Sequence, residues 1–142
     1  NVVAVGERNV AGMTLLMLAA HAGQLGAVQL LLRMSEHLGH DVELRDGRGA
    51  TALAHASRRG HADVVAELLQ TGLATQQADQ DRWTPLMHAC ANGHTRTVRL
   101  LMEAGADVCA GLRGSLLKPL MLAVINRHVE VVQTLVEISQ AE

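Results

Sequence analysis

Apolar residues recur along the chain in four blocks with helical spacing. In each block they occupy positions i, i+3 and i+4, the pattern of an amphipathic helix. The blocks are Val28, Leu31 and Leu32; Val65, Leu68 and Leu69; Val98, Leu101 and Met102; and Val132, Leu135 and Val136. An apolar segment that contains at least one alanine precedes every block. The pattern therefore predicts four pairs of helices.

These pairs belong to an internal repeat. Three copies begin at Thr14, Thr51 and Thr84, and a looser fourth begins at Lys118. The threonines are suitable N-caps, and Pro85 and Pro119 follow at the first helical position. Glycines end the first helices of the first three copies where a left-handed residue is needed: Gly23, Gly60 and Gly93. The starts are 37, 33 and 34 residues apart, which predicts a second helix about one turn longer in the first repeat.

The best copy is Thr84-Pro-Leu-Met-His-Ala-Cys-Ala-Asn-Gly-His94, followed by Gly105-Ala-Asp-Val108. It resembles the ankyrin repeat, and the resemblance extends from Asn9 to about Glu137. It implies an all-α repeat fold, an ankyrin-repeat solenoid of helix-turn-helix units with β-hairpin-like loops. The loops and the first helices then form a concave face. We expect a preceding loop or N-terminal cap at 1–8 and repeats one to four at 9–45, 46–78, 79–110 and 111–142.

Two departures from the family pattern change the expected structure. The histidine of the family's Thr-Pro-Leu-His segment is replaced in every copy, by Met17, Ala54, Met87 and Met121. We therefore expect its hydrogen bond to the loops to be lost. Arg127 replaces the turn glycine of repeat four, at a cost of ~1 kcal/mol if the left-handed geometry is kept. This irregularity predicts that repeat four is the terminal one.

Composition excludes several function classes. The chain has 142 residues, is 49% hydrophobic, and contains one Trp but neither Tyr nor Phe. This argues against β-sandwiches and against modules that stack nucleic-acid bases on aromatic rings. The net charge of -2 gives no bias toward nucleic acid or a membrane surface. No apolar run approaches the roughly 18 residues of a membrane span. We expect neither kind of partner.

Cellular context is indicated by cysteine usage and by the first residue. Two cysteines do not make a disulfide framework. They predict a reducing, intracellular location in the cytoplasm, the nucleus or both. The sequence does not begin with Met, and we expect it to be part of a larger, multidomain protein.

The histidines and cysteines do not form a catalytic pattern. His61, His94 and His128 occupy the family's structural Gly-His turn. Neighbouring His55 and His88 lack an evident third ligand for zinc. Cys90 occupies a buried helical position, where cysteines are usually inert, and Cys109 has no phased His and carboxylate partners. We expect no enzyme activity, no metal and no cofactor.

The resemblance implies a protein-binding module or scaffold that holds a partner segment on the concave face. The implied site residues are Met13, His21, Arg48, Arg58, Arg59, Asp81, Trp83, Asn92, Ile125 and Asn126. By repeat phase, nine of the 12 basic residues fall on the hairpins, the first helices or their turns, which favours an acidic partner segment. Three alternatives remain open. Trp83 could stabilise a neighbouring hairpin, the charges could be solvated surface, and the repeats could pack on another part of a longer chain.

Overall fold

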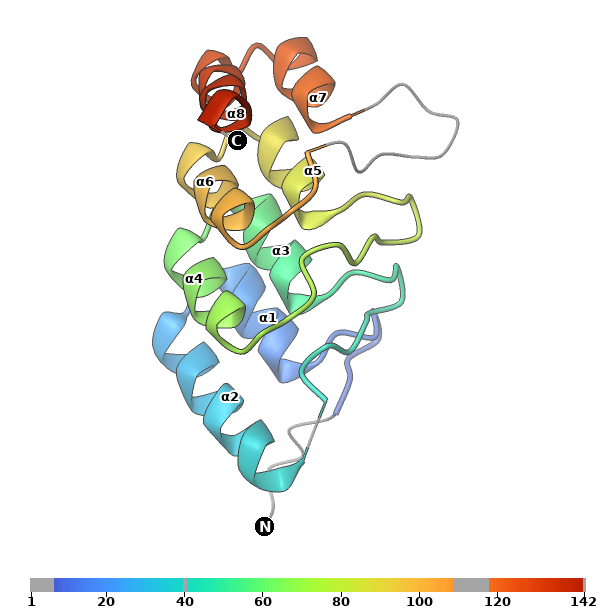
Figure 1. The fold of residues 1–142 in the computed structure, drawn as a ribbon. Helices are drawn as coiled ribbons and strands as arrows, with labels where there is room; N and C mark the ends of the chain where they lie inside the picture. Colours follow the sequence, from blue (N-terminus) through green and yellow to red (C-terminus); the bar gives the residue numbers. More distant parts are fainter. Residues whose placement is uncertain (1–6, 40, 109–117, 142) are drawn as a thin grey trace.

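The computed structural model describes residues 7–39, 41–108 and 118–141, and these residues form four consecutive pairs of α-helices. The first helices of the pairs are α1 (Leu15–Ala22), α3 (Ala52–Arg59), α5 (Pro85–Ala91) and α7 (Pro119–Ile125), and the second are α2 (Leu25–Leu38), α4 (Ala62–Gln70), α6 (Thr95–Glu103) and α8 (Val129–Ala141). Figure 1 shows two layers of helices, with the loops projecting beyond the layer of first helices. The expected all-α solenoid is confirmed.

The first helices begin where the sequence places their caps. The hydroxyl oxygens of Thr14, Thr51 and Thr84 accept hydrogen bonds from backbone N–H groups three residues later. Pro85 and Pro119 occupy the first turn, where no N–H is needed. The side chain of Lys118, at the N-cap of α7, makes no such bond.

The tight turns of the first three helix pairs are each locked by a histidine from the next repeat. Gly23, Gly60 and Gly93 have φ angles of 72°, 73° and 74°. A Cβ atom on any of these glycines would lie 2.3–2.5 Å from Nδ1 of a histidine in the following repeat. Those histidines donate from Nε2 to carbonyls of the preceding repeat: His61 to His21, His94 to Arg58, and His128 to Ala91. Their expected structural role is confirmed.

Repeat four keeps the same turn although Arg127 replaces the glycine. Arg127 has a φ of 62°, and its N–H donates to the Val124 carbonyl at 3.1 Å. The predicted left-handed strain is therefore present. The predicted extension in repeat one is also found, because α2 has 14 residues where α4 and α6 have 9 each.

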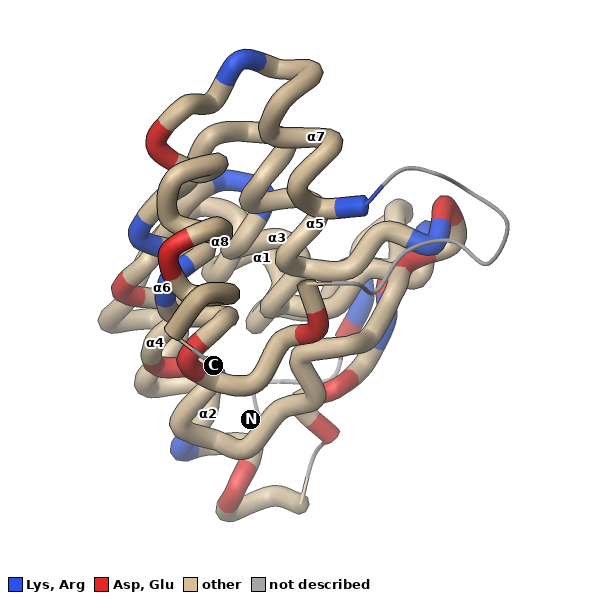
Figure 2. The backbone as a smooth tube through the Cα atoms, turned by 45° about the horizontal axis from the view of Figure 1, so that its top comes forward, with Lys and Arg blue, Asp and Glu red and all other residues tan. Residues whose placement is uncertain are grey.

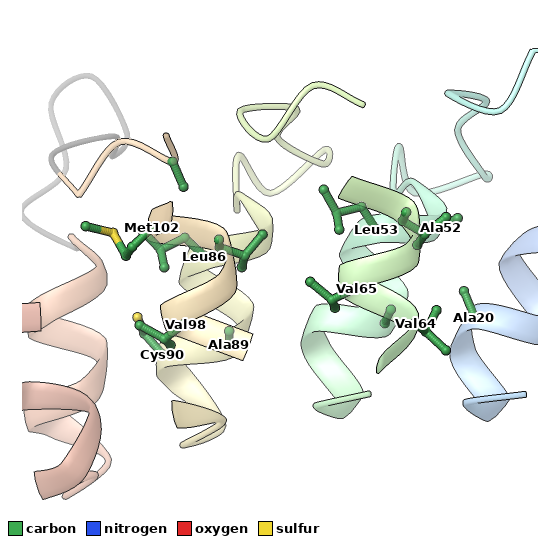
Figure 3. Packing of buried hydrophobic residues seen from close by; sticks show 14 of the residues in the cluster. Ala20, Ala52, Leu53, Val64, Val65, Leu86, Ala89, Cys90, Val98 and Met102 are labelled. Carbon is green, nitrogen blue, oxygen red and sulfur yellow. The ribbon is translucent and has the colours of Figure 1, made fainter. Parts of the chain in front are cut away.

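The core consists of small and aliphatic side chains between the layers (Figure 3). Ala20, Ala56, Ala89 and Ala123 are fully buried, so adjacent first helices approach closely without aromatic rings. Leucines and valines of the second helices, such as Leu68 and Val98, close the other side. This packing leaves the hairpins and the exposed side of the first helices to form a site.

Candidate partner-binding groove

One groove brings together much of the predicted site. It has a volume of about 430 Å³ and lies between the hairpins and first helices of repeats two and three, with Asn126 at the end of α7 beside it. Six predicted residues line it: Arg48, Arg58, Asp81, Trp83, Asn92 and Asn126. Four do not: Met13, His21, Arg59 and Ile125. We call this feature the hairpin groove.

The expected loss of the histidine–loop hydrogen bond is wrong for repeats two and three; in repeats one and four the equivalent positions are Leu18 and Leu122, which cannot make it. His55 Nε2 donates to Asp46 Oδ2 at 2.8 Å, and His88 Nε2 donates to Asp79 Oδ2 at 2.8 Å. The missing family histidine is thus replaced by the next residue along the helix. The second carboxylate oxygen of each aspartate accepts backbone N–H groups of its own hairpin, including that of Ala50 or Trp83. Each His–Asp pair fixes a hairpin against a first helix.

These four side chains line the hairpin groove but are not among the predicted site residues. A signal is visible in hindsight, since the aspartate precedes the histidine by nine residues in both repeats, 46 to 55 and 79 to 88. Burial raises the pKa of Asp46, but hydrogen bonds from Ala50, His55 and Arg48 outweigh this effect and lower the pKa below its usual value.

Trp83 is half-buried on the hairpin of repeat three. Its ring lies 5.1 Å from that of His88, tilted by 45°, and its backbone N–H donates to Asp79 at 2.9 Å. The ring therefore rests on a histidine of its own repeat and still borders the groove.

The tip of this hairpin departs from the other two described copies. Repeats one and two carry Gly12-Met13 and Gly49-Ala50, whereas repeat three carries Arg82-Trp83. Arg82 keeps the left-handed conformation, with a φ of 62°. Such a conformation costs a non-glycine residue about 1–2 kcal/mol.

Positive charge on the hairpins and first helices is more localised than the positions of the basic residues within the repeat predicted. On the described loops, basic and acidic residues are intermingled (Figure 2). Arg45 donates to the Ala78 carbonyl and the Gln77 side chain, and Arg8 donates to the Arg45 carbonyl. These two arginines tie successive loops together. Within α1, α3, α5 and α7, Arg58 and Arg59 are the only Lys, Arg, Asp or Glu residues.

Successive hairpins are also joined by single backbone hydrogen bonds. The Gly47 N–H donates to the Ala11 carbonyl at 3.0 Å, and the Gln80 N–H donates to the Arg48 carbonyl at 2.9 Å. Arg48 is thereby held at the groove by its backbone, while its side chain is exposed. The groove thus has a hydrogen-bonded frame and exposed cationic side chains.

Acidification is expected to destabilise the fold through His88 and His21. Burial lowers the pKa of His88 despite Asp79, and burial with nearby His55 lowers the pKa of His21. The unfolded chain then binds more protons than the folded one as the pH falls through about 6.5, so the free energy of unfolding falls. Chemical denaturation between pH 7.5 and 5 should show this slope. His88→Gln should reduce the slope, and a slope equal to that of the wild type would contradict the assignment.

The Cys90 thiol is expected to be unreactive in the folded protein. It is fully buried in α5, and burial raises its pKa to about 12. Native chains treated with iodoacetamide should carry no label on Cys90, whereas chains in denaturant should carry it fully; mass spectrometry locates the label. Rapid native labelling would contradict the burial. Cys109 lies outside the described residues.

The described residues show neither a metal-binding cluster nor a membrane-spanning helix, and they form one further groove. Within them, no group of three His, Cys, Asp or Glu side chains could hold a metal ion. None of their helices is long and apolar enough to cross a membrane. A larger groove of about 770 Å³ lies between α2 and α4, and Arg33 and Glu36 of α2 line it. No predicted site residue lines it.

Comparisons with known proteins agree with this geometry. A family model described as ankyrin repeats (3 copies) matches residues 16–111 and 76–142. BCL-6 corepressor-like protein 1 of Homo sapiens is 37% identical over 97 residues, 68% of this chain and 5% of that protein. Ankyrin repeat domain-containing protein 63 of Homo sapiens is 36% identical over 93 residues, 66% of this chain and 24% of that protein.

A third relative is the ankyrin repeat and SOCS box protein 16 of Mus musculus, 40% identical over 77 residues, 49% of this chain and 17% of that protein. The chain spans less than a quarter of the length of each of these three relatives. The family model, by contrast, covers nearly the whole chain. With its phased caps, turns and helix pairs, the chain belongs to the ankyrin-repeat family.

Proposed function

We propose that the hairpin groove binds an extended segment of a partner protein. Ankyrin repeats are protein–protein interaction modules, and the family fold itself is not catalytic. The observation that carries the proposal is the meeting of Trp83, Arg48 and Arg58 around one groove, from two hairpins and one first helix.

These residue types suit the recognition of an acidic segment with an apolar anchor. A half-buried Trp offers a large apolar surface, and Trp and Arg are enriched among residues that dominate binding energy. Arginine pairs with carboxylates through two parallel hydrogen bonds. Asn92 and Asn126 donate from Nδ2 to carbonyls of their own helices at 2.8 Å, which orients both amides beside the groove.

The wider context is part of the same proposal. We place the chain inside the cell, in the cytoplasm or the nucleus, where the free thiol of Cys90 fits a reducing environment. We also propose that it is the binding domain of a larger protein, because the relatives are several times longer.

Charge reversal at two adjacent arginines tests the acidic-segment proposal. Arg58 lines the groove and Arg59 does not, although both end α3 and both are exposed. Arg58→Glu is expected to weaken partner binding by about 1–2 kcal/mol, roughly 5- to 30-fold, because it places a like charge near the carboxylates. Arg59→Glu, the matched control, should have a clearly smaller effect. Titration calorimetry with a captured partner measures both, and equal affinities for Arg58→Glu and wild type would contradict the proposal.

A further inference from the structure

The end of α3 carries two exposed arginines, Arg58 and Arg59. Their guanidinium groups form no hydrogen bond or ion pair with any residue that the structure describes. Arg96 and Arg99 of α6, by contrast, pair with carboxylates of neighbouring helices. The Arg58 carbonyl already accepts a hydrogen bond from His94, so neither guanidinium group is needed to satisfy it. Both groups are therefore available to a ligand.

The ring of His21, on α1, lies against the same side of α3. Its centre is 5.6 Å from that of the His55 ring, and the two rings meet edge to face at 73°. His55, Arg58 and Arg59 occupy positions i, i+3 and i+4 of α3, which share one side of a helix. The packing of α1 on α3 thus brings the His21 ring beside both arginines. We call His21, Arg58 and Arg59 the arginine corner.

The lock between repeats fixes the backbone on both sides of the arginine corner. His21 and Arg58 occupy the same position in repeats one and two. The carbonyl of each accepts a hydrogen bond at 3.0 Å from the turn histidine of the following repeat. Burial, followed by the effects of His55, Arg59 and Arg58, lowers the pKa of His21, which agrees with this close arrangement.

His21 offers a neutral hydrogen-bond donor to the corner. Its Nδ1 is buried and has no hydrogen-bond partner among the described residues. A proton on Nδ1 would be a buried donor without an acceptor, which is costly. The favoured neutral tautomer therefore carries its proton on Nε2. Because the side chain is only half-buried, this Nε2–H group can donate to a ligand beside the arginines.

The charge of the corner is not cancelled by its surroundings. Arg58 and Arg59 are the only charged residues of the first helices when the histidines are neutral. Asp46, the acid bonded to His55, has both oxygens occupied. Its Oδ2 binds His55, and its Oδ1 accepts backbone N–H groups of the hairpin. The corner thus presents two positive charges and a neutral donor.

We propose that the arginine corner binds a phosphate monoester, the phosphorylated Ser, Thr or Tyr of a partner segment. Such a group carries about −1.5 to −2 charges and three acceptor oxygens, which match two guanidinium groups and one N–H donor. A carboxylate, with one charge and two oxygens, would engage one guanidinium group. The proposal rests on the proposed function for the segment: Arg58 also lines the hairpin groove, so the phosphate lies at the edge of that groove.

An NMR titration of the 142-residue chain tests the corner without a partner. The probe is N-acetyl-O-phosphoserine amide at pH 7.5, where the phosphate is a dianion. The nitrogen signals of His21 Nε2 and of Nε in Arg58 and Arg59 are expected to shift and saturate. The carboxylate control, N-acetyl-aspartate amide, should bind roughly ten-fold more weakly or less tightly still. Shifts that do not saturate, or equal affinities for the two compounds, would overturn the proposal.

Three variants assign the binding to the corner. Arg59→Gln is expected to weaken binding of the phosphoserine compound roughly five-fold or more. His21→Phe keeps a ring against His55 but lacks the donor, and it should weaken binding roughly 2- to 10-fold. Arg33→Gln, the matched control, removes an exposed arginine of α2 in the other layer and should bind as wild type. Wild-type affinity of Arg59→Gln, or an equal loss in Arg33→Gln, would overturn the proposal.

The corner and the groove fail separately. Trp83→Ala should not change the affinity for the phosphoserine compound, because the compound is too small to need the groove. If the compound does not bind but Trp83→Ala weakens a partner, the corner proposal is overturned and the groove stands. If the compound binds as expected and Trp83→Ala has no effect on a partner, the corner stands and the groove proposal is wrong. Arg59→Glu stays a control for partner segments without a phosphate.

Discussion

Trp83→Ala is expected to weaken partner binding about 30-fold, or about 2 kcal/mol. Trp83 contributes the large apolar surface of the hairpin groove, and its hairpin is fixed before binding by the bond from its N–H to Asp79. A partner group that packs on the ring therefore meets an ordered surface, and little of the binding energy is spent on ordering the loop. Removing the ring leaves a shallower groove around the same arginines. Titration calorimetry against the partner measures the loss.

Two controls show whether the loss of affinity is caused by removal of the Trp83 ring. Trp83→Phe keeps an aromatic surface and should recover part of the affinity. Leu30→Ala truncates an exposed apolar side chain on α2, away from the groove, and should bind as wild type. Circular dichroism must show the same helix content for all three variants. Wild-type affinity of a folded Trp83→Ala variant would mean that Trp83 serves the hairpin alone.

Gly60→Ala is expected to lower the free energy of unfolding by about 2–3 kcal/mol. Its φ of 73° is left-handed, which costs alanine about 1–2 kcal/mol. The new Cβ would also lie 2.3 Å from Nδ1 of His94, so the imidazole must move away. It then gives up its 3.0 Å hydrogen bond to the Arg58 carbonyl, a net loss of about 1 kcal/mol. Urea denaturation followed by circular dichroism measures the total.

Gly72→Ala is the matched control for the histidine contribution. Gly72 has a nearly identical φ of 76°, but no atom lies within 4 Å of the added Cβ. Its variant should lose about 1–2 kcal/mol from backbone strain alone. The difference between the two variants measures the lock between repeats. If both lose the same stability, His94 does not contribute through this contact.

The repeat could be predicted from the sequence because its signals are local. Each signal acts within one helix end. Thr51 caps the N–H three residues later, Pro85 occupies a first turn, and Gly60 takes a left-handed conformation. Their phase then fixes the stacking, since one helix pair cannot bury its apolar side alone. The same repeat phase predicted that Trp83 lies on a hairpin, where the structure shows it half-buried.

The hairpin frame could not be predicted from local signals. His55 and His88 replace the family histidine by reaching the loop from one position later, which depends on the course of the hairpin backbone. The basic face was predicted to be wider than the structure shows, for a similar reason. Arg8 and Arg45 belong to the basic set by phase, yet their guanidinium groups bind loop carbonyls. Position along a repeat gives the face of a residue but not its partner.

Site-specific photo-crosslinking tests the central claim, partner capture in the hairpin groove, most directly. A benzophenone amino acid would replace Asn92, which lines the groove, or Arg96, which is exposed on α6 in the other layer of helices. Illumination with the partner should give a crosslinked product from position 92 and little from position 96, and Trp83→Ala should suppress it. Crosslinking from position 96 alone, or equally from both positions, would contradict binding in the groove.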